Sequence, residues 1–323
     1  MFSCFFHKLN FLTFSFILIS TSNNSCSNKF EGSNLPVLAD TNRLKNDLIN
    51  IVHFTRRNYL YTDYLDSARD YIKGEFLKIT PDVEMQSYLA LGPILYYNVI
   101  CSLGPANAER IIIGAHYDVC GEQPGADDNA SGVAGLLELA RLLKNDSLKY
   151  RIDFVAYTLE EPPFFATTLM GSYIHAKYLF EKKIPVKGML CLEMIGYFND
   201  AENSQKYPLG FLKWFYGNKG DFITIVQKFN NGKFGRELKS ILKKEHSLPT
   251  KFFKGPKGLA GIGLSDHRNY WHFGYSAVMV TNTAFYRDKN YHTPEDKPEK
   301  LDVKRMGFVV DELYNAIKKI NKK

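Results

Sequence analysis

The sequence contains five short segments whose histidine and acidic side chains are suited to metal-assisted hydrolysis. Imidazole nitrogens and carboxylate oxygens, with no thiolate among them, are typical ligands of zinc in sites that keep one coordination position open. Zinc in such a site activates water and can polarise a carbonyl group. The segments contribute His116 and Asp118, Asp127 and Asp128, Glu160 and Glu161, Glu193, and His292.

Glu160 and Glu161 show why metal ions are expected here. They follow an apolar, strand-like run at 153–159, and a buried carboxylate without a counter-charge is costly. Each signal alone is weak, because a Glu-Glu pair or a histidine after a strand usually lies at a solvated surface. Several carboxylates and two imidazoles in one place repel one another or lie desolvated unless cations bind them. A pair of divalent ions resolves that conflict.

The elements that must position these side chains alternate between strand and helix patterns. This alternation predicts an α/β fold of three layers, with an open mixed, mostly parallel sheet and helices on both faces. Ligand sites in such sheets gather at the carboxyl ends of the strands, and four of the five segments follow predicted strands. We expect strands at 87–91, 98–103, 110–115, 152–158, 187–193, 222–226 and 277–281, and helices at 38–54, 64–77, 132–144, 170–181, 234–246 and 302–319.

In content and order, these segments resemble the M28 co-catalytic zinc peptidases, a family that includes bacterial leucyl aminopeptidases and glutamate carboxypeptidases. The matching motifs run from 110 to 296, and the flanking helices fit as well. The resemblance implies the zinc exopeptidase fold over nearly the whole chain beyond residue 26. The motifs are His116-Tyr-Asp118, Pro124-Gly-Ala-Asp-Asp128-Asn-Ala-Ser-Gly132, Glu160-Glu161, Glu193-Met194, Ser265-Asp266-His267 and Tyr291-His292-Thr-Pro-Glu-Asp296.

The resemblance also implies two zinc ions per chain, with Asp128 as the bridge between them. Glu161 and His292 would complete the ligand set of one ion, and His116 and Glu193 would complete that of the other. Many aminopeptidases of the family have aspartate where this chain has Glu193. The second metal position therefore departs from the family pattern by one methylene group.

Two further carboxylates are implied to act beside the ligands. Asp118 would accept the second ring N–H of His116 and so fix the tautomer that binds metal. Glu160 would be the general base, which takes a proton from zinc-bound water and delivers it to the leaving amine. His267 and His272 lie in an aromatic helical segment, and we expect them to be structural.

Three functions are compatible with these residues. The first is a metallo-aminopeptidase that acts on peptide substrates, whose free amino terminus is held by acidic groups near the metals. The second is glutaminyl cyclase, an acyltransferase of similar fold with one zinc, but two complete ligand sets favour the hydrolase. The third is a non-catalytic binding ectodomain, which has no reason to retain Glu160 with every ligand. Carboxypeptidase or dipeptidase preference stays open within the first.

The composition narrows the class of protein. A chain of 323 residues, 45% hydrophobic and 14% aromatic, is sufficient for a large α/β core. Lysine and arginine outnumber aspartate and glutamate by 41 to 34, but they are scattered, so we expect no nucleic-acid partner. No repeat or low-complexity tract divides residues 27–323, which we expect to form one domain of unspecified oligomeric state.

Residues 1–26 have the outline of an export leader. Lys8 precedes a short apolar run at 11–19, and a small polar stretch follows at 20–25. The run is well below the length that a membrane-spanning helix needs. The segment is either a signal peptide or a lipoprotein leader, in which case Cys26 would carry a lipid that attaches the protein to a membrane. We expect an exported protein that is periplasmic, secreted or lipid-anchored to the cell envelope.

Two other features give structural expectations. Cys101, Cys120 and Cys191 lack the paired spacing of a thiolate metal site or a disulfide framework, and each lies at or beside an apolar run. We expect them to be buried free thiols. The segment 199–221 is aromatic and has no clear periodicity, so we expect a surface loop that shapes the substrate pocket.

Overall fold

The structure is a computed structural model that describes residues 37–245 and 247–322. The predicted leader at 1–26 and its Cys26 lie outside these residues, so export and lipid attachment stay predictions. Within the described ranges, no helix combines the length and the apolar character needed to cross a membrane.

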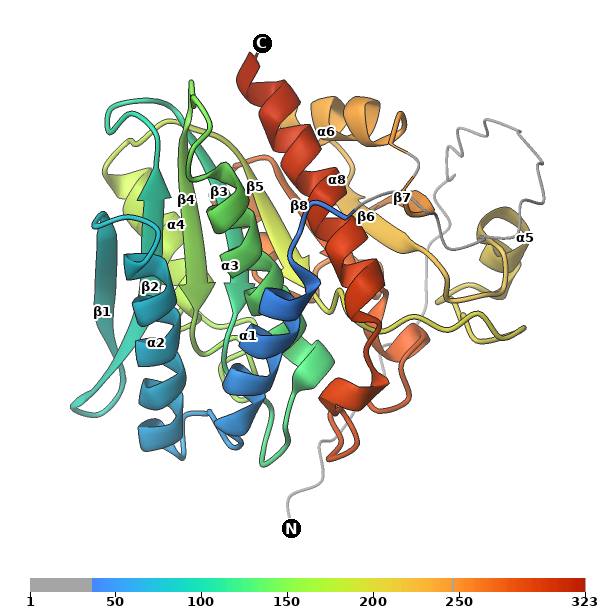
Figure 1. Ribbon diagram of the computed structural model, residues 1–323, viewed down its shortest axis with the longest axis horizontal. Helices are drawn as coiled ribbons and strands as arrows, with labels where there is room; N and C mark the ends of the chain where they lie inside the picture. The colour runs from blue at the N-terminus through green and yellow to red at the C-terminus, as the bar shows by residue number, and fades with distance from the viewer. Residues whose placement is uncertain (1–36, 246, 323) are drawn as a thin grey trace. The chain divides into compact units, whose positions relative to one another are not determined.

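One mixed sheet of eight strands forms the middle layer (Figure 1). The strands are β1 (Val83–Leu91), β2 (Ile94–Leu103), β3 (Arg110–His116), β4 (Arg151–Tyr157), β5 (Val186–Glu193), β6 (Ile223–Lys228), β7 (Thr250–Gly255) and β8 (Ala277–Thr281). Their order is β1-β2-β4-β3-β5-β8-β6-β7. The β4-β3, β3-β5, β5-β8 and β6-β7 pairs are parallel, and the β1-β2, β2-β4 and β8-β6 pairs are antiparallel. The predicted mixed, mostly parallel sheet is confirmed.

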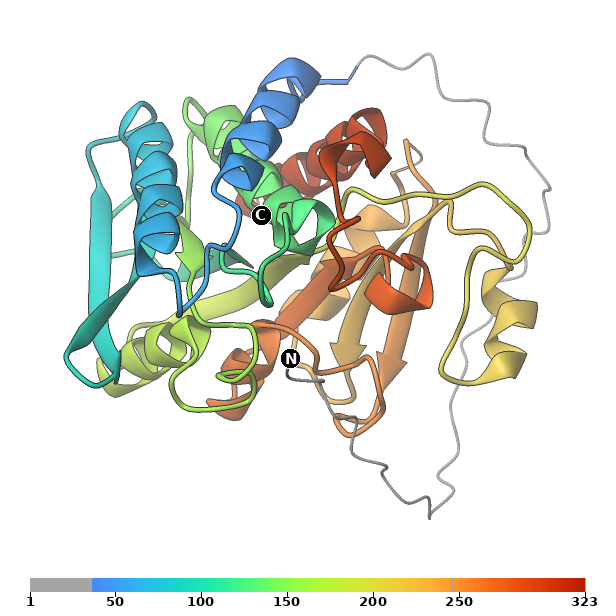
Figure 2. The same ribbon diagram turned by 90° about the horizontal axis from the view of Figure 1, so that it is seen from below.

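Helices cover both faces of this sheet, as predicted (Figure 2). The helices are α1 (Thr41–His53), α2 (Thr62–Leu77), α3 (Gly132–Leu143), α4 (Gly171–Glu181), α5 (Lys213–Tyr216), α6 (Phe234–Leu242), α7 (His267–His272) and α8 (Val303–Lys322). On one face α1, α3 and α8 pack against one another, with α2 beside α3; on the other face α4 packs against α7.

Helix α1 shows how the local sequence specifies these layers. The side chain of Asp40 accepts hydrogen bonds from two backbone N–H groups of the first turn, which satisfies donors that the helix leaves free. Leu44, Leu48 and Ile51 recur at helical spacing and are fully buried. The apolar stripe therefore packs against α3 and α8.

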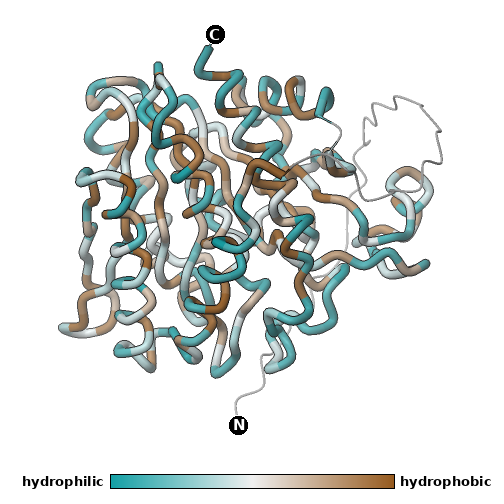
Figure 3. Tube along the Cα trace, in the orientation of Figure 1, coloured by the Kyte–Doolittle hydropathy of each residue, from teal (hydrophilic) through white to brown (hydrophobic). Residues whose placement is uncertain are grey.

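The central strands are apolar along nearly their whole length because helices cover both of their faces. In β3, Ile111, Ile112 and Ile113 are fully buried, as are Met189 and Leu190 in β5. Figure 3 shows hydrophobic segments through the middle of the sheet and hydrophilic residues along the outer helices. This core gives the ends of the strands a rigid platform.

Strand β7 is the one strand that the sequence pattern did not predict. It lies at the edge of the sheet beside β6, and most of its residues are only half-buried. Lys251 and Lys254 interrupt its apolar run, which is typical of edge strands. The segment 256–263 that follows is a loop.

Candidate metal centre

All five predicted ligands meet at one edge of the sheet. His116 is the last residue of β3, and Glu193 is the last residue of β5. Glu161 follows the end of β4, and Asp128 lies in η1 (Ala126–Ser131), directly before α3. His292 comes from the loop after β8. Because the parallel strands end on the same side of the sheet, side chains distant in sequence converge there.

Asp128 lies at the centre of this group and faces both histidines. Its Oδ1 atom is 3.3 Å from His116 Nε2, and its Oδ2 atom is 3.1 Å from His292 Nε2. His116 Nε2 is also 3.5 Å from Glu193 Oε2, and His292 Nε2 is 3.2 Å from Glu161 Oε1. The side chains thus form two donor sets that share one carboxylate, each with a histidine and a glutamate.

The hydrogen bonding of the group supports cation binding. Asp128, Glu161 and Glu193 are all buried, with 2%, 4% and 7% of their surface exposed. Glu161 Oε1 and His292 Nε2 have no hydrogen-bond partner among the described residues, although both are buried atoms. Buried polar atoms normally have hydrogen-bond partners. Two unpaired atoms of this kind that lie 3.2 Å apart therefore indicate a site for a cation. The donor types fit divalent metal ions, and His116, Asp128 and Glu193 offer three ligand atoms within 4.8 Å of one another.

The pKa shifts show the same need for positive charge. Burial raises the pKa of Glu161 to about 7 and also raises that of Glu193. Burial acts in the same direction on Asp128, but His116 and His292 outweigh it and lower the pKa of Asp128. Burial disfavours both imidazolium ions, yet the surrounding carboxylates raise the pKa of each histidine well above its usual value. Divalent cations would supply this positive charge with both imidazoles neutral.

Asp118 connects three of the site residues. Its Oδ1 atom lies 3.5 Å from His116 Nδ1, on the side of the ring that faces away from Asp128. Its carboxylate also accepts hydrogen bonds from the backbone N–H groups of Glu160 (3.2 Å) and Glu161 (3.1 Å). Asp118 therefore has the predicted position beside His116 and also orients the glutamate pair, which the sequence did not indicate.

Glu160 lies beside the two donor sets that share Asp128 and is a member of neither set. One of its oxygens, a ring nitrogen of His116 and an oxygen of Glu161 lie within 4.8 Å of one another. Burial, together with the charges of Glu161, Glu193 and others, raises the pKa of Glu160 well above its usual value, although His116 opposes this. A carboxyl group whose proton affinity is raised in this way is suited to proton transfer.

The Ser265-Asp266-His267 motif supports the site from below Glu193. Ser265 donates a hydrogen bond of 2.5 Å to Glu193 Oε2, and this bond holds the longer glutamate side chain in place. His267 is fully buried, with Nε2 2.7 Å from the backbone carbonyl of Ile262, and burial lowers its pKa to about 4. His272 is exposed. His267 is therefore a buried structural histidine, as predicted, whereas His272 lies at the surface with its ring against Tyr173 and Phe273.

The backbone around Asp128 is fixed by another carboxylate. Asp296, the last residue of the Tyr291 to Asp296 motif, accepts hydrogen bonds from the backbone N–H groups of Asp127 (2.8 Å) and Asp128 (3.0 Å). Asp127 does not face the metal ligands; its carboxylate accepts from the backbone N–H groups of Gly196 and Tyr197. Asp128 therefore faces the two histidines, whereas Asp127 holds the backbone at Gly196 and Tyr197.

Arg57 is a buried residue that the sequence analysis missed. It is fully buried and donates hydrogen bonds to the carbonyl oxygens of Tyr117 (2.8 Å), Pro124 (2.5 Å) and Gly125 (2.8 Å). These residues frame the loop between His116 and Asp128. Arg57 therefore closes this loop and adds positive charge near the carboxylates of the site.

Arg57→Met is expected to lower the free energy of unfolding by about 3 kcal/mol, because three buried carbonyl oxygens lose their partner. Urea denaturation measures this change. Arg56→Met is the matched control: Arg56 is 47% exposed and pairs with Glu122, and losing such a surface pair changes stability by about 1 kcal/mol or less. Equal effects of the two substitutions would contradict the role of Arg57.

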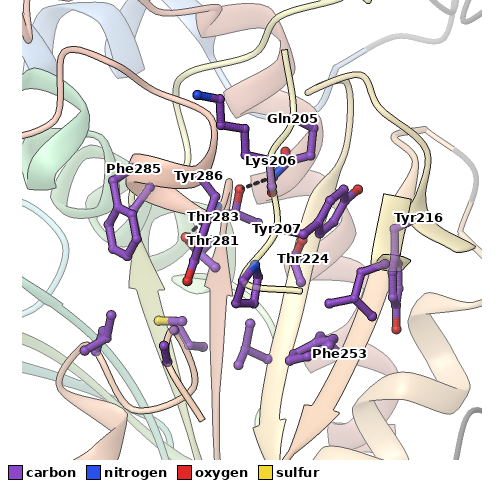
Figure 4. Close-up of a pocket in the computed structure, with 18 of the residues that line it drawn as sticks. Gln205, Lys206, Tyr207, Tyr216, Thr224, Phe253, Thr281, Thr283, Phe285 and Tyr286 are labelled. Carbon is purple, nitrogen blue, oxygen red and sulfur yellow. Dashed lines mark hydrogen bonds between the residues drawn. The ribbon is translucent and has the colours of Figure 1, made fainter. Parts of the chain in front are cut away.

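An apolar cavity of about 100 Å³ opens next to Glu193. Figure 4 shows Tyr207, Tyr216, Phe253, Phe285 and Tyr286 around it. Thr224 and Val226 of β6 and Met279 of β8 also line the cavity, together with Tyr291, the neighbour of His292. The predicted pocket-shaping segment 199–221 contributes several of these residues, and its Trp214 points to solvent with 76% of its surface exposed.

The cysteines differ from one another more than the sequence indicated. Cys101 and Cys191 are buried and free, as predicted. Cys120 is also free, but it is only partly buried, and it lies beside Glu161 and His292. The prediction of a buried core thiol is wrong for Cys120, because the loop after β3 carries it out to the metal centre.

Comparison with known proteins gives a family and several relatives. The profile of peptidase family M28 matches residues 98–316. YfbL of Escherichia coli strain K12, described as uncharacterized, is 43% identical over 267 residues, which covers 79% of this chain and 81% of YfbL. Leucine aminopeptidase 1 of Pyrenophora tritici-repentis is 27% identical over 223 residues, which covers 65% of this chain and 51% of that protein. This chain therefore spans about half the length of that aminopeptidase.

Solved structures share the fold. LapB from Legionella pneumophila has a TM-score of 0.70 at 22% identity, over 88% of this chain and 73% of LapB. BSAP, a zinc aminopeptidase from Bacillus subtilis, has a TM-score of 0.54 at 23% identity, over 71% of this chain and 51% of BSAP. Glutaminyl cyclase from Fimbriiglobus ruber has a TM-score of 0.66 at 19% identity, over 90% of this chain and 99% of the cyclase. With the family match and the similarity to YfbL, the motif residues gathered at the sheet edge identify this chain as a member of peptidase family M28.

Proposed function

We propose that this protein is a two-zinc aminopeptidase that removes amino acids from the N-terminus of peptides. One observation carries the proposal: the two oxygens of Asp128 face two histidines, and each histidine has its own buried glutamate. This arrangement supplies two complete donor sets around a shared carboxylate. The names of the relatives and of BSAP support zinc and aminopeptidase chemistry.

The donor sets define which residues would hold the metals. Asp128 would bridge the ions, with Glu161 and His292 on one and His116 and Glu193 on the other. When bound, metal in this centre would lower the pKa of water and stabilise the oxyanion that forms on the scissile carbonyl. Asp118 and Ser265 would keep His116 and Glu193 oriented for this task.

Proton transfer is assigned to Glu160. Its raised proton affinity and its place beside His116 and Glu161 suit a group that accepts a proton from the attacking water. The same carboxyl group can then donate that proton to the leaving amine. The acidic side chains of the site also favour a substrate whose free amino terminus carries positive charge.

The apolar cavity beside Glu193 is the proposed binding site for the side chain of the N-terminal residue. Its aromatic and aliphatic walls would favour a large apolar side chain, whose burial there is favourable. Lys206, at the rim, is exposed and would disfavour a basic residue in the same place.

Val226→Phe is expected to fill part of this cavity. The second-order rate constant kcat/KM for leucyl anilides should fall about 10- to 100-fold relative to that for alanyl anilides, because steric exclusion acts on the larger side chain. The alanyl substrate serves as the internal control for the state of the metal centre. An unchanged ratio of the two constants would remove this cavity from substrate recognition.

The proposed function is tested with a panel of chromogenic anilides. We expect release of the chromophore from leucyl anilide and no release from its N-acetylated form. A chelator should abolish the release, and added zinc should restore it. Release from the acetylated substrate would contradict N-terminal specificity, and release that a chelator does not affect would contradict metal chemistry.

Glutaminyl cyclase is the second candidate, because the Fimbriiglobus ruber enzyme aligns over 99% of its own length. The two activities differ in their products: a cyclase converts an N-terminal glutamine into pyroglutamate and releases ammonia. A glutaminyl peptide in the same panel therefore separates them. Ammonia release without hydrolysis of leucyl anilide would favour the cyclase.

A further inference from the structure

The thiol of Cys120 lies beside Glu161 and His292, which belong to one of the two donor sets. Its Sγ atom, one carboxylate oxygen of Glu161 and one ring nitrogen of His292 all lie within 4.8 Å of one another. Cys120 is a free thiol and is partly buried. Neither the second donor set, around His116 and Glu193, nor the proposed catalytic chemistry makes use of this thiol.

The loop that carries Cys120 is held in place by the two residues that precede the thiol. Two residues earlier, Asp118 accepts the backbone N–H groups of the glutamate pair. The neighbouring Val119 donates its backbone N–H to the carbonyl oxygen of Arg57 at 3.0 Å. His292 approaches from the opposite loop, with its ring stacked on Tyr291 at 3.8 Å between centroids. The thiol is therefore held near the donors by backbone contacts.

The neighbours of Cys120 are themselves open donors. Glu161 is 4% exposed, and its Oε1 atom has no hydrogen-bond partner among the described residues; the same holds for His292 Nε2. Both residues belong to the three-residue set that contains the thiol. A cation between them would satisfy the carboxylate, the imidazole and the sulfur together.

We propose that Cys120, as a thiolate, is a further ligand of the metal ion held by Asp128, Glu161 and His292. The inference rests on the proposed metal centre. On binding, the sulfur loses its proton to solvent and forms the metal–sulfur bond. This ion then has four protein ligands, which is typical of a closed tetrahedral zinc site. The ion held by His116, Asp128 and Glu193 has three and keeps an open position.

The proposal makes the two metal positions unequal. A thiolate is a soft ligand, so the position with Cys120 should prefer zinc, cadmium or cobalt over magnesium or manganese. The position with Glu193 has only nitrogen and oxygen donors, so its affinity should differ less between these metals. Water activation is then assigned to the ion beside Glu193, which lies nearer the apolar cavity.

Cobalt titration of the metal-free full chain tests the thiolate directly. Cobalt in the wild-type protein should show visible d–d bands and a thiolate-to-cobalt charge-transfer band in the near ultraviolet. Cys120→Ser and Cys120→Ala should lose the charge-transfer band and keep the d–d bands. Cys101→Ser is the matched control, because Cys101 is buried in β2, away from the donor sets, and should keep both signals.

Alkylation of the thiol gives a second readout that does not depend on activity. With free zinc at about 100 times its Kd, alkylation of Cys120 by iodoacetamide should slow roughly 100-fold relative to the metal-free protein. Peptide mapping identifies the modified residue. Equal rates with and without zinc, or d–d bands without a charge-transfer band in the wild type, would overturn the role of Cys120 and leave the metal centre intact. Absence of all cobalt bands would instead overturn the metal centre on which it rests.

Discussion

Glu160→Gln is expected to lower kcat by about 10²- to 10⁴-fold while the protein keeps both metal ions. The amide has nearly the shape of the carboxylate but cannot take a proton from water. Glu160 lies beside His116 and Glu161, and the contacts that link Asp128 to the two histidines and their glutamates do not involve it. Elemental analysis and steady-state kinetics on the same preparation measure the two quantities.

The adjacent Glu161→Gln is the matched control for this result. Glu161 faces His292 at 3.2 Å and belongs to a donor set, so its substitution should reduce metal content together with turnover. Turnover near the wild-type value in Glu160→Gln, or a loss of metal equal to that in Glu161→Gln, would remove Glu160 from the role of general base.

Asp128→Asn is expected to abolish the binding of both ions and the stability that they confer. Metal that binds only the folded state stabilises it by about 4 kcal/mol per site when its free concentration is 1,000 times Kd. The shared carboxylate contributes to both sites, so its loss should remove the zinc-dependent rise in Tm. Thermal unfolding with and without zinc measures that rise.

Asp127→Asn separates metal binding from loop stability. The Asp127 carboxylate is buried and accepts hydrogen bonds from Gly196, Tyr197 and Asn282, so this variant should have a lower Tm in the absence of zinc. Its zinc-dependent rise in Tm should nevertheless remain. A rise that persists in Asp128→Asn would show that Asp128 does not bridge the ions.

The placement of the ligands could be predicted because it follows from the strands. His116 and Glu193 end β3 and β5, whose apolar runs are long and buried on both faces. Strands of this kind are visible in the sequence, and parallel strands bring their carboxyl ends to one edge. The position of Asp128 depended on the family resemblance, because it lies in a short helical turn that does not follow a strand directly.

Arg57 and Cys120 could not be predicted for a physical reason. Arg57 lies in a polar stretch between two helices, and it is buried only because the loop from Tyr117 to Gly125 folds over it. Cys120 follows an apolar strand, which favoured a core position, but the loop turns it toward His292. Both cases depend on contacts between segments that are distant in the sequence, and the periodicity of apolar residues within one segment does not indicate such contacts.

Strand β7 shows the same limit at the edge of the sheet. An edge strand is buried on fewer sides, so its lysines interrupt the alternation by which strands are recognised. Phe253 of β7 nevertheless lines the apolar cavity. The proposed preference for the N-terminal side chain therefore rests partly on an element that the sequence did not reveal.

The most direct test of the two-zinc aminopeptidase is a zinc titration of the metal-free protein, with bound zinc and leucyl anilide hydrolysis measured at each step. We predict saturation at two zinc ions per chain, with hydrolysis that rises as the ions bind and disappears with a chelator. One zinc per chain without hydrolysis would contradict the proposal and favour the cyclase, and no bound zinc would favour a binding domain that has lost the chemistry.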